Sequence, residues 1–233
     1  MSPLRNFFCL ALAAASLAAS AADLPSDARI TYDVLYGDGQ FRVGRAEQHW
    51  HVESGHYELR TELIPMLGPR ISYLSKGRLT ERGLVPDSFA EYRGGESAPR
   101  VKAEFDWERQ QVRYGRVDEE RTAALERGAQ DVNALAFQLA WLGDHAPGAI
   151  QVATGKKVSR YSFRAGARSQ LTVNGVQADA RSWRSSSGQD RTEVWVAAQF
   201  ANLPVRVIRA DDDKEVQLVA RQVQVTSSAH NNP

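Results

Sequence analysis

The sequence predicts a mainly β protein, an antiparallel sheet against which one helix packs. Two observations support this fold class. Short runs in which apolar and polar residues alternate recur along the chain, and turn signals rich in Gly, Asn and Asp separate them. Only one stretch, which follows residue 131, has the spacing of apolar residues that is typical of an amphipathic helix.

The N-terminus has the pattern of a secretory signal. Arg5 precedes an apolar run over residues 7–19, and Ala19-Ser20-Ala21 supplies the small residues of a cleavage site. The run is too short to span a membrane, which takes about 20 residues, so we expect residues 1–22 to be cleaved and no transmembrane segment to remain. The sequence therefore predicts a periplasmic protein. Cys9 is the only cysteine and lies inside the run, so neither lipidation nor a disulfide is expected.

Length and charge narrow the class of protein further. We expect one domain over residues 23–226, which is long enough for a sizeable core, and a disordered polar tail over 227–233. Of the 29 Lys and Arg residues Arg5 lies in the signal, which leaves 28 against 28 Asp and Glu. A nearly neutral chain without a basic block makes nucleic acid an unsuitable partner.

The first two strands show the alternation most clearly. Apolar residues alternate with polar ones over residues 30–36, and Gly37-Asp38-Gly39 then turns the chain. In the next run, residues 41–52, the apolar positions change face near Gly44. A β-bulge causes such a change, because an extra residue turns every later side chain to the other face.

Further strands follow at short spacing, as an antiparallel meander requires. Asn174-Gly175 is a strong two-residue hairpin turn. Pro at residues 86 and 204 suits the first position of a strand, which predicts strands in the segments 84–89 and 202–207. The expected strands cover residues 57–63, 71–73, 101–107, 112–114, 157–163, 169–173, 176–183, 193–196, 204–208 and 216–225.

The one predicted helix runs from a capping Asp131 to Leu142 and ends at Gly143. One apolar stripe should pack on the sheet; it consists of Val132, Leu135, Ala136, Leu139 and Leu142. Phe137 and Trp141 form a second apolar pair on another face, which a helix lying on a sheet does not require. Either loops bury this second face, or the helix is a lid over an apolar cavity.

Motifs of catalytic or metal sites are weak. His49 and His51 flank Trp50 on a strand and should face water, so no metal site is predicted. Asp211-Asp212-Asp213 suits a solvated hairpin turn, and Gly155-Lys156-Lys157 lacks the other residues of a phosphate loop. No GxSxG motif occurs. We therefore expect no cofactor and no enzymatic activity.

Several aromatic residues fall at inward positions of their strands, and core packing is the default for each. A strongly curved sheet encloses more volume than one layer of side chains fills, which would leave an apolar pocket. The residues expected to line it are Tyr73, Phe105, Trp107, Phe137, Trp141 and Trp195.

A family resemblance rests on the C-terminal third. Trp195, the segment Leu203-Pro204-Val205-Arg206-Val207 and the Asp-rich turn before Val216 resemble the signature of DUF3108, a family of uncharacterised bacterial periplasmic proteins. In the N-terminal half, Tyr32, the strand with Gly44, and Leu84-Val85-Pro86 with Phe89 after it resemble that family as well. The sequence departs from the signature at Val196, where an Asp would follow the Trp.

The same arrangement of Trp, Pro and turn is similar to the lipoprotein carriers of the LolA/LolB type. That resemblance implies a curved antiparallel sheet forming an unclosed barrel, with a helix on its concave side and an apolar cavity for acyl chains. We therefore expect non-catalytic binding of a lipid, an acyl chain or another apolar envelope ligand. Two alternatives remain: an envelope scaffold that recruits a protein partner by strand addition, and a polysaccharide hydrolase with two paired carboxylates.

Overall fold

The structure, a computed structural model, describes residues 24–37, 41–187, 190–211 and 214–226. These residues form one sheet of 15 strands in the order β8-β7-β6-β5-β4-β3-β2-β1-β15-β14-β13-β12-β11-β10-β9. The predicted signal peptide, the predicted tail, and Asp212 and Asp213 lie outside the described residues. No helix among the described residues is long and apolar enough to cross a membrane.

All neighbouring strands are antiparallel except β9 and β10, which are parallel. The bounds are β1 (Asp27–Tyr36), β2 (Phe41–Glu53), β3 (His56–Pro65), β4 (Ile71–Thr80), β5 (Gly83–Arg93), β6 (Val101–Asp106), β7 (Gln111–Gly115), β8 (Arg121–Ala124), β9 (Gln130–Asp131), β10 (Gly148–Ala153), β11 (Val158–Val173), β12 (Val176–Ser187), β13 (Asp190–Ala197), β14 (Pro204–Asp211) and β15 (Lys214–Thr226).

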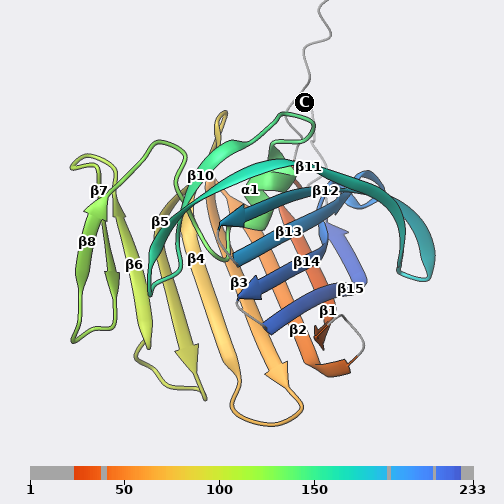
Figure 1. The fold of residues 1–233 in the computed structure, drawn as a ribbon, viewed down its shortest axis with the longest axis horizontal. Helices are drawn as coiled ribbons and strands as arrows, with labels where there is room; N and C mark the ends of the chain where they lie inside the picture. The colour runs from red at the N-terminus through yellow and green to blue at the C-terminus, as the bar shows by residue number, and fades with distance from the viewer. Residues whose placement is uncertain (1–23, 38–40, 188–189, 212–213, 227–233) are drawn as a thin grey trace, which may run out of the picture.

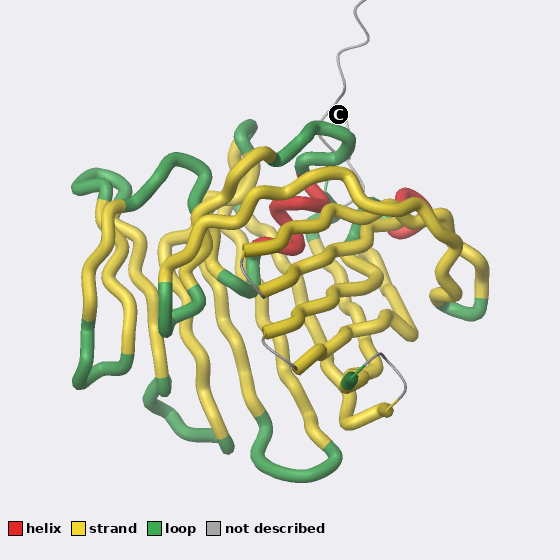
Figure 2. Tube along the Cα trace, in the orientation of Figure 1, coloured by secondary structure: helices red, strands yellow, loops and turns green. Residues whose placement is uncertain are grey.

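The sheet curls into two walls around a single α-helix, α1 (Leu135–Trp141). Strands β1–β8 form the N-terminal wall and β10–β15 the C-terminal wall, and pairing of β1 with β15 joins the two (Figure 1). Figure 2 shows the helix in red between the walls. Because β8 and β9 end the sheet without pairing to each other, the barrel is unclosed, which confirms the predicted fold class.

Both apolar faces of α1 are buried by the walls. Phe137 stacks on Trp50 of β2, with ring centroids 4.7 Å apart, and has no exposed surface. Leu135 and Leu139 belong to a second apolar cluster, which the C-terminal wall supplies with Val194 and other residues. The second helical face therefore packs against the opposite wall, and Phe137 fills the space between them.

The helix is shorter than the sequence predicts. It begins after Ala134, not at Asp131, which lies in β9. The Asp131 carboxylate still accepts the backbone N–H groups of Asn133 and Ala134, at 2.8 and 2.9 Å. Its capping geometry therefore closes the turn before the helix, and the predicted start was wrong by one turn.

Local backbone predictions for the hairpins hold. The pairing of β1 with β2 shifts register between Val34 and Leu35, opposite the predicted change of face near Gly44. A Cβ at Gly44 would lie 2.6 Å from the Ile64 carbonyl oxygen, so only glycine allows β3 to approach this closely. Asn174 and Gly175 have φ of 53° and 76°, as their two-residue turn requires.

Three strands, β8, β9 and β10, were not predicted, and one strand, β11, was predicted as two separate strands. The predicted strands 157–163 and 169–173 are parts of one strand, β11, which begins at Val158 and whose pairing with β12 shifts register between Ala165 and Arg168. That bulge changes which residues face inward, so the alternation along β11 is interrupted in the sequence.

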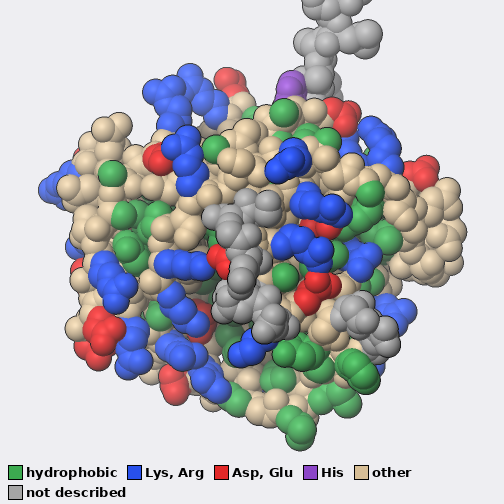
Figure 3. All heavy atoms as spheres, viewed as in Figure 1, with side chains coloured by type: hydrophobic (Ala, Val, Ile, Leu, Met, Phe, Trp, Pro, Cys, Tyr) green, Lys and Arg blue, Asp and Glu red, His purple; other side chains and the backbone are tan. Residues whose placement is uncertain are grey.

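Apolar side chains are also exposed at one end of the molecule. In Figure 3 they gather at the lower rim, where Figure 1 draws the start of β2 and the connection β3–β4. The most exposed large ones there are Leu67 at 91%, Met66 at 72% and Phe41 at 67%. They contribute little to the core.

Candidate functional site

A cavity of about 790 Å³ opens beside the connection between β4 and β5. We call it the β5 cavity; it is lined by Thr80, Glu81, Arg82, Leu84, Val85, Trp107, Arg127 and Gly128. Its volume lies within the range of about 300–1,000 Å³ that small-molecule sites occupy.

The cavity lies where β5 extends beyond its partner. Strand β6 pairs with β5 only at residues 88–91, so the first part of β5 forms no backbone ladder with β6. Side chains satisfy its backbone instead: Leu84 N–H donates to Gln138 Oε1 at 2.7 Å, and Gln130 Nε2 donates to the Leu84 carbonyl at 2.8 Å. These bonds join this part of β5 to α1 and to β9.

Trp107 forms the aromatic part of the lining. Its Nε1 donates to the Pro86 carbonyl at 2.7 Å, and its ring lies against Phe105 with centroids 6.2 Å apart. A fixed indole that presents an apolar face to a hollow is a common feature of sites that bind apolar ligands.

Helix α1 approaches the cavity through Gln138. A Cβ on Gly83, which has φ of +95°, would lie 2.4 Å from Gln138 Oε1. The positive φ favours glycine there, and a larger residue would also displace the Gln138 side chain.

Charge at the cavity is mainly positive. Arg82 and Arg127 are exposed, and neither guanidinium has an ion pair among the described residues. Glu81 is the single carboxylate of the lining. Two arginines beside an apolar surface suit a ligand that joins an acidic group to an apolar body.

A buried polar network joins the turn before α1 to the N-terminal wall. Tyr32 donates from its hydroxyl to Gln48 at 3.0 Å, Gln48 donates to Thr61 at 2.8 Å, and Thr61 donates to Asn133 at 2.7 Å. The network continues through the backbone of Asn133 to Asp131, whose Oδ1 also accepts from Ser75 at 2.6 Å. It fixes the turn before α1 to strands β1–β4.

Asp131 has an unusual environment within this network. Its side chain is fully buried, and its Oδ2 has no hydrogen-bond partner among the described residues. Burial raises the pKa of Asp131 to about 6, although hydrogen bonds from Ser75 and two backbone amides act in the opposite direction. Burial also raises the pKa of Tyr57, and the Asp131 charge adds to that effect.

The six predicted ligand-binding aromatics divide into two groups. Tyr73, Phe105 and Trp107 lie in one apolar cluster of the N-terminal wall, and of these Trp107 lines the cavity. Phe137, Trp141 and Trp195 belong to the core around Trp50 and do not line it. The structure therefore brings the first three together and places the others in a different part of the molecule.

Sequence reasoning missed most of the lining. Leu84 and Val85 were recognised only as part of a strand, and nothing in the pattern distinguished Arg82 or Arg127 from other surface arginines. Gln48 and Thr61 did carry a signal, because both are polar residues at the inward positions of their strands.

The two strand histidines lie as predicted. His49 and His51 are exposed at 41% and 49%, and both contact the Asp27 carboxylate, at 2.8 and 3.3 Å. Among the described residues no group of three or more potential metal ligands is placed to hold an ion.

The chain is similar to one protein family and to two solved structures. The family model described as "Protein of unknown function (DUF3108)" matches residues 31–218. A beta-barrel-like protein of the domain of unknown function DUF1849 from Brucella abortus aligns with a TM-score of 0.53 at 11% identity, over 89% of this chain and 100% of that one. A "putative lipoprotein" from Parabacteroides distasonis aligns with a TM-score of 0.37 at 6% identity, over 88% and 99%. No curated protein sequence matches this chain.

Proposed function

This chain belongs to the DUF3108 family of proteins of unknown function, and we propose that it is a periplasmic, non-catalytic binding protein for an amphiphile with an apolar chain and an acidic head group. The observation that carries the proposal is the β5 cavity of about 790 Å³, with apolar walls and two unpaired arginines. The periplasmic location is supported by the signal pattern of residues 1–22.

The cavity suits both parts of such a ligand. Val85 and Trp107, which are partly exposed, offer apolar surface, and burying an acyl chain against it contributes about 0.8 kcal/mol per methylene group. Arg82 and Arg127 would contact the acidic group from the rim, where water remains accessible.

Other features favour binding of an amphiphile over the two alternatives. The strands that end the sheet, β8 and β9, have 4 and 2 residues, so each offers little backbone for strand addition. Hydrolysis of a polysaccharide would use two carboxylates, and the cavity lining contains Glu81 alone.

Isothermal titration calorimetry with oleate tests the proposal. We expect saturable binding, and weaker binding of oleyl alcohol, which has the same chain without the acidic group. Val85→Trp would fill the cavity and weaken oleate binding by about tenfold or more. Val176→Trp, the same change at an exposed valine of β12, is the matched control and should leave binding unchanged.

Two results would reject the proposal. One is the absence of saturable oleate binding to a folded protein. The other is equal loss of binding in Val85→Trp and Val176→Trp, because the β5 cavity would then have no special part in it.

A further inference from the structure

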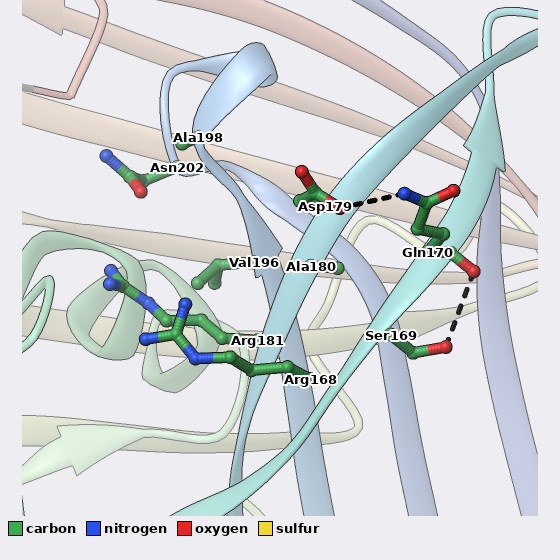
Figure 4. Close-up of a pocket in the computed structure, with 9 residues that line it drawn as sticks. All are labelled: Arg168, Ser169, Gln170, Asp179, Ala180, Arg181, Val196, Ala198 and Asn202. Carbon is green, nitrogen blue, oxygen red and sulfur yellow. Dashed lines mark hydrogen bonds between the residues drawn. The ribbon is translucent and has the colours of Figure 1, made fainter.

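A second hollow, of about 430 Å³, lies on β11–β13 and has a different chemical character (Figure 4). We call it the arginine pocket, after Arg168 of β11 and Arg181 of β12, which line it together with Asn202. It shares no lining residue with the β5 cavity.

The two arginines are directly opposite each other. Arg168 is paired in register with Arg181, and opposed residues of antiparallel strands share a face of the sheet. The bulge between Ala165 and Arg168 sets this register. In Figure 4 both side chains extend toward the same space, with their guanidinium groups side by side.

Like charges in directly opposed positions destabilise a sheet unless something lies between them. Among the described residues, Asp144 is the single carboxylate bonded to the pair; it contacts Arg181 and its side chain is 68% exposed. Among the same residues, the Arg168 side chain has no ion pair or hydrogen bond, and Arg181 Nε is buried without a hydrogen-bond partner. The pair therefore has an excess positive charge and unused donors.

The other residues that line the arginine pocket do not neutralise the charge of the two arginines. Asp179 lies further along β12, where its carboxylate accepts from Gln170 Nε2 at 3.2 Å, so it does not neutralise the arginines. Asn202, in the connection to β14, lies on the same side of the strands as the guanidinium groups and adds an amide. Val196, in register with Arg181, is a buried residue at the base of the pocket.

We propose that the arginine pocket binds a phosphate group, held between Arg168 and Arg181. Guanidinium groups present paired N–H donors that match phosphate oxygens, and two neighbouring guanidinium groups can contact one tetrahedral anion. The hollow has room beyond the anion, so a phosphate ester with a short organic part fits better than free phosphate. This site is independent of amphiphile binding in the β5 cavity.

The inference is tested by titrating the protein with inorganic phosphate and with glycerol 3-phosphate. The NMR signals of the arginine Nε–Hε groups report binding. We expect saturable shifts of Arg168 and Arg181 and tighter binding of glycerol 3-phosphate. Equal affinity for the two probes would assign the site to the anion alone. Arg168→Gln should weaken binding by about tenfold or more, the loss of one bidentate charged contact.

Arg164→Gln is the matched control, because Arg164 is also exposed on β11, has no ion pair, and changes the net charge equally. It should alter affinity by less than about twofold. Absence of saturable shifts with either probe, or equal weakening by the two substitutions, would overturn the inference. Oleate binding should be unchanged in Arg168→Gln, so this site and the β5 cavity can fail separately.

Discussion

At the scale of single residues, Asp131 joins the sheet to the helix. Its Oδ1 accepts from Ser75 on β4 and from two amides of the turn before α1, whereas its Oδ2 has no partner. A buried carboxylate with one unsatisfied oxygen favours its protonated form, which is the direction in which burial raises the pKa of Asp131, to about 6.

This pKa predicts a dependence of stability on pH. The folded protein holds the Asp131 proton more tightly than the unfolded chain, whose value is near 3.8, so stability falls as pH rises from about 4 to about 6. Two pH units correspond to about 3 kcal/mol. Asp131→Asn keeps the Oδ1 acceptor and cannot ionise, so it should lose this dependence and be at least as stable as the wild type at pH 7.5.

Urea denaturation of both proteins at several pH values measures the effect. Asp131→Ala is the control, because it removes three hydrogen bonds and should be less stable at every pH. An Asn variant whose stability follows the wild-type curve between pH 4 and 6 would show that Asp131 does not titrate as inferred.

At the scale of elements, α1 separates the two walls of the sheet. Although it has 7 residues, it buries Leu135 and Leu139 on the C-terminal wall and Phe137 against Trp50. An isolated helix of this length is unstable in water, so packing must supply its stability.

Phe137→Ala should therefore lower the free energy of unfolding by about 3–5 kcal/mol, because a large cavity would remain between the walls. Leu67→Ala is the control: that side chain is 91% exposed, and its truncation should change stability by no more than about 0.5 kcal/mol. Chemical denaturation measures both. Similar small losses in the two variants would mean that the walls do not depend on α1.

At the scale of the whole molecule, the sequence patterns predicted an antiparallel sheet and most of its strands, and the resemblance to LolA/LolB-type carriers implied its curved, unclosed form. Alternation and turn residues act over a few neighbours, so they revealed features such as the Asn174-Gly175 hairpin and the bulge near Gly44. Strands β8 and β9 were not predicted, because each is too short to show an alternating pattern.

The candidate site was predicted only in part, for a physical reason. Trp107 was expected to face inward, but its neighbours in the cavity, Arg82 and Arg127, are distant in sequence and are brought together by the curvature of the sheet. The doubly apolar helix suggested a lid, although a second wall of the same sheet buries its other face. Periodicity reports that a face is buried, and not what buries it.

Quenching of tryptophan fluorescence by a brominated fatty acid tests the central claim most directly, because bromine quenches an indole on contact. We predict strong quenching in the wild type, its loss in Trp107→Phe, and its persistence in Trp141→Phe, since Trp107 lines the β5 cavity and Trp141 does not. Equal quenching in all three proteins, or none in the wild type, would contradict binding of an acyl chain in the β5 cavity.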